Sequence, residues 1–351
     1  MTTNIQNLRT PKCFFWMNGQ RLDLTVPSRF NDYLVSLKTK TIVMQNSRRK
    51  FLQNVGIAIA GISLQPKVLW SKETVLAKKK MLIGIQLYSV RVDMMKNPMG
   101  TLTALAKMGY QHVEHANYVN GKFYGYQASE FKKVLGGLGL SMPSGHTVMT
   151  PNHWDAKKND FTDVWKKTIE DAAIMGQEYV ISPWMDEKAR SSYDGLMRQL
   201  DQFNKCGELC KQQGMMFGYH NHNFEFTEKV NGEVIYDLIL KHTDPDKVMQ
   251  QLDFGNMYGA GARGADWIKK YPGRFASLHV KDEIKVEKGE MNDGYESTTL
   301  GDGVVDPKAV SLLAKEIGGA HHFIIEQESY QKLTPLEAAK VDLDRMKTWN
   351  I

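Results

Sequence analysis

The chain is poor in cysteine, in long apolar runs and in glycine-rich nucleotide-binding loops, and each scarcity excludes a class of protein. Its three cysteines provide no disulfide framework, and Cys206 and Cys210, four apart on a predicted helix, are expected to pack in the core. The apolar stretch 55–64 is shorter than the ~20 residues of a membrane-spanning helix, so we expect no stable membrane insertion. No glycine-rich fingerprint follows the first predicted strand, which argues against a doubly wound dinucleotide-binding sheet.

The charge is divided unevenly along the chain. Residues 1–80 contain 14 Lys and Arg and 3 Asp and Glu, which leaves 31 basic and 36 acidic side chains, of 45 and 39 in all, for residues 81–351. The net charge of +6 therefore hides a mildly acidic main part. Such a part offers no basic face for phosphates, and we expect no nucleic-acid partner.

The basic excess near the N-terminus has a specific pattern. Segment 47–64, SRRKFLQNVGIAIAGISL, places two arginines before Phe-Leu and a short apolar run, and it resembles a twin-arginine export signal. The resemblance implies the twin-arginine export machinery as a partner and a periplasmic or otherwise exported protein. Such signals stand at the extreme N-terminus, and MQNSRRKFLQN, from Met44, has the form of a normal start. We therefore expect residues 44–77 to be signal peptide and linker, and residues 1–43 to be an over-extended gene start or, alternatively, a disordered extension.

From residue 78 onward the chain alternates short apolar runs with longer segments of helical periodicity. Strands are predicted at 81–88, 110–116, 140–147, 178–184, 215–222, 248–254, 275–281 and 321–328. Helices are predicted at 98–108, 129–138, 161–175, 194–213, 234–242, 265–271 and 307–317, and a last one has Thr334 as N-cap and Pro335 at its first position. Eight strands alternating with eight helices predict an α/β protein with a single (β/α)8 TIM barrel over residues 78–351.

Four residues that can bind a metal lie late in the last four predicted strands: His220, Asp253, His279 and Glu326. A parallel barrel gathers such strand ends at one mouth. Two imidazoles and two carboxylates would neutralise a divalent charge and leave positions open for substrate oxygens, and they suit Mn, Zn, Co or Fe better than Mg alone. We therefore predict that these four residues bind one divalent ion. Taken singly, each has a structural alternative; Asp253, for example, could cap the next helix.

Other strand-end side chains are predicted to move protons or to contact the substrate. His146, at the end of the third strand, is a candidate second base beside Glu326 and His220. The predicted substrate contacts are His222, Glu114, Trp184, Asn256 and Lys281.

Residues 81–351 resemble the xylose-isomerase-like TIM-barrel superfamily, often described as sugar phosphate isomerases/epimerases. The motifs are GIQLYSVR at the first strand, LDFGN at the sixth, LHVKD at the seventh and the loop LGDGVVD. The resemblance implies a divalent metal held by a strand-five Glu, a strand-six Asp, a strand-seven His and a strand-eight Glu. The last three carry over to Asp253, His279 and Glu326. The first departs, because the Glu-Asn-His of many relatives is His-Asn-His at 220–222, and His220 is expected to replace the glutamate as ligand.

The departure at His220 matters for the reaction. Epimerases of this family use two metal-bound glutamates on opposite faces of the substrate, and this chain keeps only Glu326 of that pair. The first hypothesis is a metal-dependent isomerase or epimerase of a sugar or sugar derivative, acting by proton abstraction next to a metal-bound carbonyl. The alternative is a lyase or dehydratase that performs β-elimination on a keto-sugar or 3-keto-glycoside, which His220 and export favour. A non-catalytic carbohydrate-binding barrel is the third.

All three hypotheses have a small carbohydrate as partner. A phosphorylated sugar is not expected, because no cluster of Lys or Arg follows strands seven and eight. The loop LGDG at 300–303 offers backbone N–H groups to an anion, but a plain turn explains it equally well. The sequence leaves open which sugar, which ion and whether the protein is a homo-oligomer.

Overall fold

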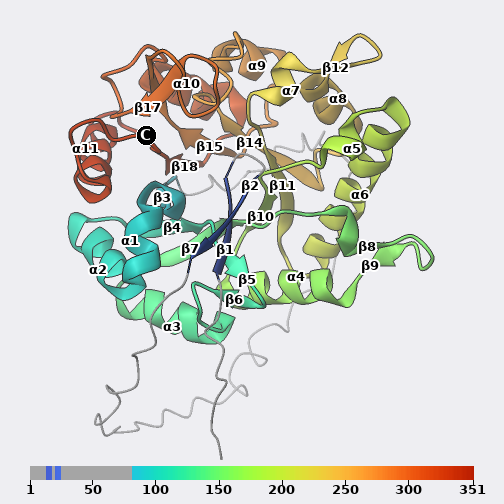
Figure 1. Ribbon diagram of the computed structural model, residues 1–351, viewed down its shortest axis with the longest axis horizontal. Coiled ribbons are helices and arrows are strands. Elements are labelled where there is room, and N and C mark those ends of the chain that lie inside the picture. Colours follow the sequence, from blue (N-terminus) through green and yellow to red (C-terminus); the bar gives the residue numbers. More distant parts are fainter. Residues whose placement is uncertain (1–12, 18–19, 25–80) are drawn as a thin grey trace, which may run out of the picture. The chain divides into compact units, whose positions relative to one another are not determined.

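Eight parallel strands close into a barrel in the computed structural model, which describes residues 13–17, 20–24 and 81–351 (Figure 1). In chain order the strands are β3 (Leu82–Gln86), β4 (His112–His115), β7 (Ser141–His146), β10 (Tyr179–Ser182), β11 (Met216–His220), β14 (Val248–Asp253), β15 (Ser277–Val280) and β18 (His322–Ile325). Each pairs with the next, and β18 closes the barrel on β3. The predicted (β/α)8 barrel is confirmed, and every strand lies within the range predicted for it.

Helices surround the barrel and connect consecutive strands (Figure 1). The main ones are α2 (Pro98–Met108), α3 (Ala128–Gly137), α4 (Asp163–Met175), α6 (Tyr193–Gln212), α8 (Ile235–His242), α9 (Gly264–Lys270), α10 (Pro307–Leu313) and α11 (Pro335–Lys347). Helix α11 begins as predicted: Thr334 is its N-cap in a capping box with Glu337, and Pro335 occupies the first turn. Cys206 and Cys210 on α6 are buried in the core, as expected.

Short elements that the sequence did not predict lie in the connections. They include α1 (Arg91–Lys96), α5 (Glu187–Arg190), α7 (Phe224–Thr227) and the antiparallel pairs β5–β6 (Tyr118–Val119, Lys122–Phe123), β8–β9 (Trp154–Asp155, Asp160–Phe161), β12–β13 (Lys229–Val230, Glu233–Val234) and β16–β17 (Asp282–Lys285, Tyr295–Thr298). The pair β16–β17 follows β15 almost directly, so it stands at the carboxyl mouth where the site lies.

Side chains of alternate residues fill the barrel interior in layers. Tyr179, Ile181 and Met249 form an apolar cluster of their own, separate from the core between strands and helices. A polar layer follows toward the carboxyl ends, and all of its members are 0% exposed: Gln86, Glu114, Ser144, Gln251 and Ser277. Three predicted site residues, His146, Asp253 and His279, stand two positions further along the same strand faces as Ser144, Gln251 and Ser277.

The N-terminal predictions fall mostly outside the described residues. Of segment 1–43, the structure describes β1 (Cys13–Met17) and β2 (Gln20–Leu24), an antiparallel pair. The predicted export signal and linker at 44–77 lie wholly outside the described part. Among the helices that the structure does describe, none has the length and apolar character needed to cross a membrane.

Candidate metal centre and active site

Three of the four predicted metal ligands lie together at the carboxyl end of the barrel. Asp253 ends β14, His279 lies in β15 and Glu326 directly follows β18. One ligand atom from each lies within 4.8 Å of the others, and all three side chains are buried. Two carboxylates and an imidazole at this spacing are a donor set that suits a divalent ion.

His279 lies between two carboxylates. Its Nδ1 is 3.0 Å from Oε2 of Glu326, and its Nε2 is 2.6 Å from Oε1 of Glu114. Burial by itself lowers the pKa of this imidazole, but Glu326 and Glu114 outweigh burial and raise it to about 10. His279 is therefore an imidazolium in the metal-free protein and donates one hydrogen bond to each carboxylate.

Asp253 has one oxygen engaged and one without a partner. Oδ1 accepts a hydrogen bond of 2.7 Å from the backbone N–H of Asn256, so the aspartate does stabilise the turn after β14. Oδ2 is buried without a hydrogen-bond partner among the described residues and lies 3.8 Å from Nδ1 of His279. Burial raises the pKa of Asp253 to about 7, although Lys281 opposes the shift. A buried carboxylate oxygen requires a partner, and a divalent ion shared with His279 and Glu326 would supply one, so these residues fit a metal.

A buried glutamine fixes the protons of two further histidines. Nε2 of Gln251 donates to Oε2 of Glu114 at 2.9 Å, because an ionised carboxylate only accepts, and it also donates to Oγ of Ser277 at 3.0 Å. Oε1 of Gln251 therefore faces Nε2 of His146 at 2.6 Å and Nδ1 of His220 at 3.2 Å. Both of these nitrogens must carry hydrogens. In the neutral rings the lone pair is consequently on Nε2 of His220 and on Nδ1 of His146.

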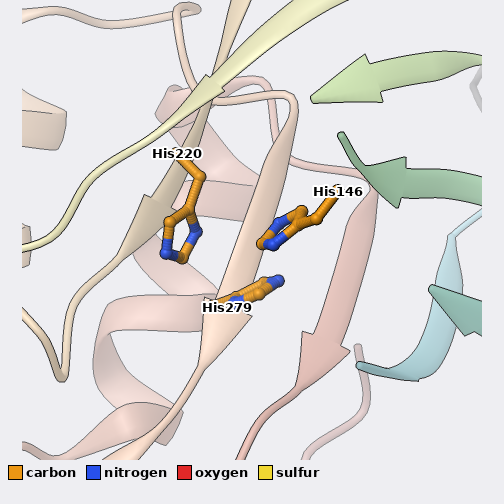
Figure 2. Close-up of side chains that lie close together, drawn as sticks. All are labelled: His146, His220 and His279. Carbon is orange, nitrogen blue, oxygen red and sulfur yellow. The ribbon is translucent and has the colours of Figure 1, made fainter. Parts of the chain in front are cut away.

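His146, His220 and His279 face one another across the mouth (Figure 2). Their ring centroids are 4.6 to 5.0 Å apart, and one nitrogen from each lies within 4.8 Å of the others. Burial lowers the pKa of His146 and, reinforced by the neighbouring histidines, lowers that of His220 well below its usual range. Both are neutral at pH 7. Among the described residues His220 groups with these histidines at that spacing rather than with Asp253 and Glu326, so the four predicted ligands do not form one group of this size.

Lys281 is a fully buried cation beside Glu326. Its Nζ donates to Oε1 of Glu328 at 2.6 Å and to Oδ1 of Asn256 at 2.9 Å, and it lies 3.9 Å from Oε2 of Glu326. Burial opposes ionisation, but the carboxylates around Lys281, Glu328 first, raise its pKa well above the usual range. Burial would likewise raise the pKa of Glu326, and His279 and Lys281 lower it instead. Glu326 is thus an ionised carboxylate at any working pH.

Trp184 and His222 form an aromatic rim on this mouth. The indole of Trp184 is 41% exposed and stands edge-on to the imidazole of His222, with centroids 5.5 Å apart. Nδ1 of His222 is buried without a hydrogen-bond partner among the described residues, and burial lowers the pKa of the ring to about 3. An apolar ring face beside a neutral imidazole suits the mixed apolar and hydroxyl surface of a sugar.

Glu114 has a different place from the one predicted. It is 0% exposed, and its oxygens accept hydrogen bonds from Gln86, Ser144, Gln251 and His279. The predicted substrate contact is therefore corrected: Glu114 lies beneath the histidines and orients them, because its oxygens are already engaged.

The LGDG loop is closed by the chain itself. The carboxylate of Asp282 accepts hydrogen bonds of 2.8 to 3.0 Å from the backbone N–H groups of Gly301, Gly303 and Val305. These N–H groups already donate to a side chain of the protein. Of the two alternatives given for LGDG, an anion-binding loop or a plain turn, the structure supports the turn. An anion would have to displace Asp282 to bind there.

Three residues that position the site were not predicted: Gln251, Gln86 and Ser144. The sequence did contain a signal for two of them, because a polar residue two positions before a strand-end residue shares its face of the strand. Gln251 precedes Asp253 in this way, and Ser144 precedes His146.

Comparisons with known proteins identify the family to which the barrel belongs. The sequence profile of a family described as xylose isomerase-like TIM barrel matches residues 102–349. An inosose dehydratase from Geobacillus thermodenitrificans is 27% identical over 169 residues, which are 44% of this chain and 54% of the relative. The chain thus spans about half the length of the curated relatives it matches.

Solved structures match over most of the barrel. A sugar phosphate isomerase/epimerase from Parabacteroides distasonis superposes with a TM-score of 0.66 at 26% identity, over 79% of this chain and 97% of that one. A protein named IOLI, crystallised with a bound zinc atom, superposes with a TM-score of 0.60 at 14% identity, over 77% and 98% of the two chains. The latter likeness is one of fold alone.

Proposed function

We propose that this chain, which belongs to the xylose isomerase-like TIM barrel family, is a divalent-metal-dependent enzyme that isomerises or epimerises a sugar or sugar derivative. The observation that carries the proposal is the buried group of Asp253, His279 and Glu326 at the barrel mouth, with neutral His146 and His220 beside it. A divalent ion bound there would polarise a sugar carbonyl and make the adjacent C–H more acidic.

Asp253, His279 and Glu326 would hold the ion, and His220 is our proposed fourth ligand. The nitrogen of His279 that faces Asp253 and Glu326 is Nδ1, while Nε2–H donates to Glu114. An outer carboxylate on the far nitrogen is the arrangement that orients metal-binding histidines in proteins. The lone pair of His220 lies on Nε2, because Gln251 accepts the hydrogen of Nδ1.

Proton transfer falls to Glu326 and to the two neutral histidines. Glu326 is ionised, since His279 and Lys281 overcome the effect of burial on its pKa, and so it can accept a proton at one of its oxygens. His146 offers a lone pair on Nδ1 and a hydrogen on Nε2, so it can accept a proton on one side while Gln251 and Glu114 hold the other. Asn256, Lys281, His222 and Trp184 are the proposed substrate contacts.

A dehydratase is the second candidate, and His220 favours it. β-Elimination needs one base to take a proton and one acid to protonate the departing hydroxyl, whereas two-base epimerisation needs matched bases on opposite faces of the substrate. Of the two metal-bound glutamates that the family's epimerases use as bases, this site has only Glu326. Neutral imidazoles, including that of His220, lie beside the proposed metal ligands. The curated relatives named inosose dehydratase are consistent with a cyclic keto-polyol as substrate.

Incubation of metal-loaded protein in deuterated water separates the candidates. The substrates would be free aldoses and ketoses, a cyclic keto-polyol and 3-keto-glycosides. Solvent deuterium in a stereoisomer or in an aldose–ketose product supports the first candidate. An unsaturated product, or one that has lost water or an aglycone, supports the second. No exchange and no turnover with any divalent ion would refute both and favour a carbohydrate-binding barrel.

Export through the twin-arginine pathway is proposed from the segment SRRKFL at 47–52. Replacing Arg48 and Arg49 by lysine should retain the protein in the cytoplasm of a host with this pathway. N-terminal sequencing of the exported product would also test the boundary near residue 77, and a mature protein that begins before residue 44 would contradict the proposed start.

A further inference from the structure

The amino-terminal end of the barrel contains a second group of metal-binding side chains. Glu178 directly precedes β10, and His321 and His322 stand at the start of β18. His322 and Glu326 are four residues apart along one strand direction, so this group lies about 13 Å from the carboxyl mouth. The three residues line a cavity of about 290 Å³, together with His112, Ser141 and other residues that begin strands.

The ligand atoms of this group are already close. One atom each from Glu178, His321 and His322 lies within 4.8 Å of the others, and Nε2 of His322 is 3.5 Å from Oε2 of Glu178. His321 and His322 are 4% and 1% exposed. Nδ1 of His322 is buried without a hydrogen-bond partner among the described residues, so no described group competes with a ligand for this nitrogen.

The tautomer of His321 is set for ligation. Its Nδ1 lies 3.1 Å from the backbone oxygen of Gly319, which only accepts, so Nδ1 carries the hydrogen. The lone pair is then on Nε2, where the hydroxyl of Tyr179 donates to it at 2.7 Å. A backbone carbonyl on the far nitrogen is a usual support for a metal-binding histidine, and an ion would take the place of the Tyr179 hydroxyl at Nε2.

We propose that Glu178, His321 and His322 bind a first-row transition-metal ion of the zinc class at the amino-terminal end of the barrel. Two imidazoles favour such an ion over Mg²⁺ or Ca²⁺, which prefer oxygen ligands. The carboxylate of Glu178 favours a cation over an anion. This site is separate from the candidate active site and does not depend on the proposed function.

The position of the site indicates a structural role. Strands β10 and β18 are not neighbours in the closed barrel: three strands separate them on either side. An ion bound by Glu178 and by the two histidines would tie opposite sides of the barrel end together. Because the ion would bind only the folded state, it would raise the unfolding temperature in proportion to the logarithm of its free concentration.

The test counts bound zinc in metal-free full-length protein by equilibrium dialysis and elemental analysis. Wild type should bind two ions per chain, and Asp253→Ala, which lacks a ligand of the carboxyl-end site, should keep one. In the Asp253→Ala background, Glu178→Gln should weaken the remaining site at least roughly tenfold. Its matched control is Glu170→Gln, which replaces an exposed glutamate of α4. No zinc in Asp253→Ala, or equal affinity in the Glu178→Gln and Glu170→Gln proteins, would overturn the proposal.

The Glu178 variant should fold, because this side chain is 57% exposed. A second measurement in wild type is independent of variants: an anomalous difference map from a zinc-soaked crystal. A peak between His321 and His322 supports the site, and a map with a peak at the carboxyl mouth but none here overturns it.

Discussion

Metal binding at the carboxyl mouth should release protons, and the number follows from the structure. In the metal-free protein His279 holds a proton between Glu114 and Glu326 with a pKa of about 10. Its Nδ1 must lose that proton to become a ligand. Asp253, with a pKa of about 7, must also be ionised to bind. His220 is already neutral, because burial lowers its pKa, and releases none.

The expected stoichiometry therefore changes with pH. Near pH 8, His279 is protonated and Asp253 is mostly ionised, so about one proton leaves per ion bound. Near pH 6 both groups are protonated, and about two protons leave. The apparent affinity should rise with pH for the same reason, because protons compete with the ion for these two side chains.

Isothermal titration of Mn²⁺ into the metal-free protein, in two buffers with different ionisation enthalpies, measures the released protons directly. Glu114→Gln is the informative variant, because it removes one of the two carboxylates that hold the proton on His279. Near pH 9, the Glu114→Gln variant should release far fewer protons per Mn²⁺ bound than the wild-type protein. Tight binding of Mn²⁺ near pH 8 with no proton released would refute the assignment of His279 as ligand.

Three further predictions concern single side chains. Glu326→Gln should weaken metal binding, because Glu326 is a proposed ligand, and at saturating metal it should still lower turnover by roughly 10²- to 10⁴-fold, the usual contribution of a general base. Measuring kcat at saturating metal checks this, and unchanged kcat would exclude Glu326 as base. Lys281→Met should cost about 3 kcal/mol of unfolding free energy, since it removes a fully buried cation and leaves the partly buried carboxylate of Glu328 unpaired. Urea denaturation should show part of the loss restored in Lys281→Met/Glu328→Gln, and equal stability of the single variant would contradict the pairing. Burial raises the pKa of Asp342 to about 7. The protonated side chain therefore contributes stability that is fully present below pH 4 and is lost as the pH rises through 7. Asp342→Asn should melt progressively higher than wild type from pH 5 to 8, and a pH-independent difference in melting temperature would contradict the raised pKa.

The barrel could be predicted because local signals and the global fold agree. Each strand is a short apolar run bounded by helix signals, and some helices carry explicit start signals, as Thr334 and Pro335 do for α11. The short pairs such as β16–β17 were missed, because two to four residues carry too little periodicity to be recognised. The helix predicted at 307–317 is α-helical only as far as Leu313, and a π-helical turn, Ala314–Gly318, continues it.

The site could be predicted only as far as strand order determines it. Parallel strands bring Asp253, His279 and Glu326 to one mouth whatever their rotamers, so the spacing of these residues along the chain was sufficient. The place of His220 depends on its bond to Gln251, and the burial of Glu114 depends on how deep its layer lies in the closed barrel. Those are properties of packing between distant segments, which no local pattern records.

The most direct test of the account is the position of a metal ion in a crystal of the full-length protein soaked in Mn²⁺. An anomalous difference map should show a peak within about 2.3 Å of Oδ2 of Asp253, Nδ1 of His279 and a carboxylate oxygen of Glu326. The peak should vanish in Asp253→Ala while the barrel is retained. A crystal of the wild-type protein that binds Mn²⁺ elsewhere, with no peak among these three side chains, would contradict the account.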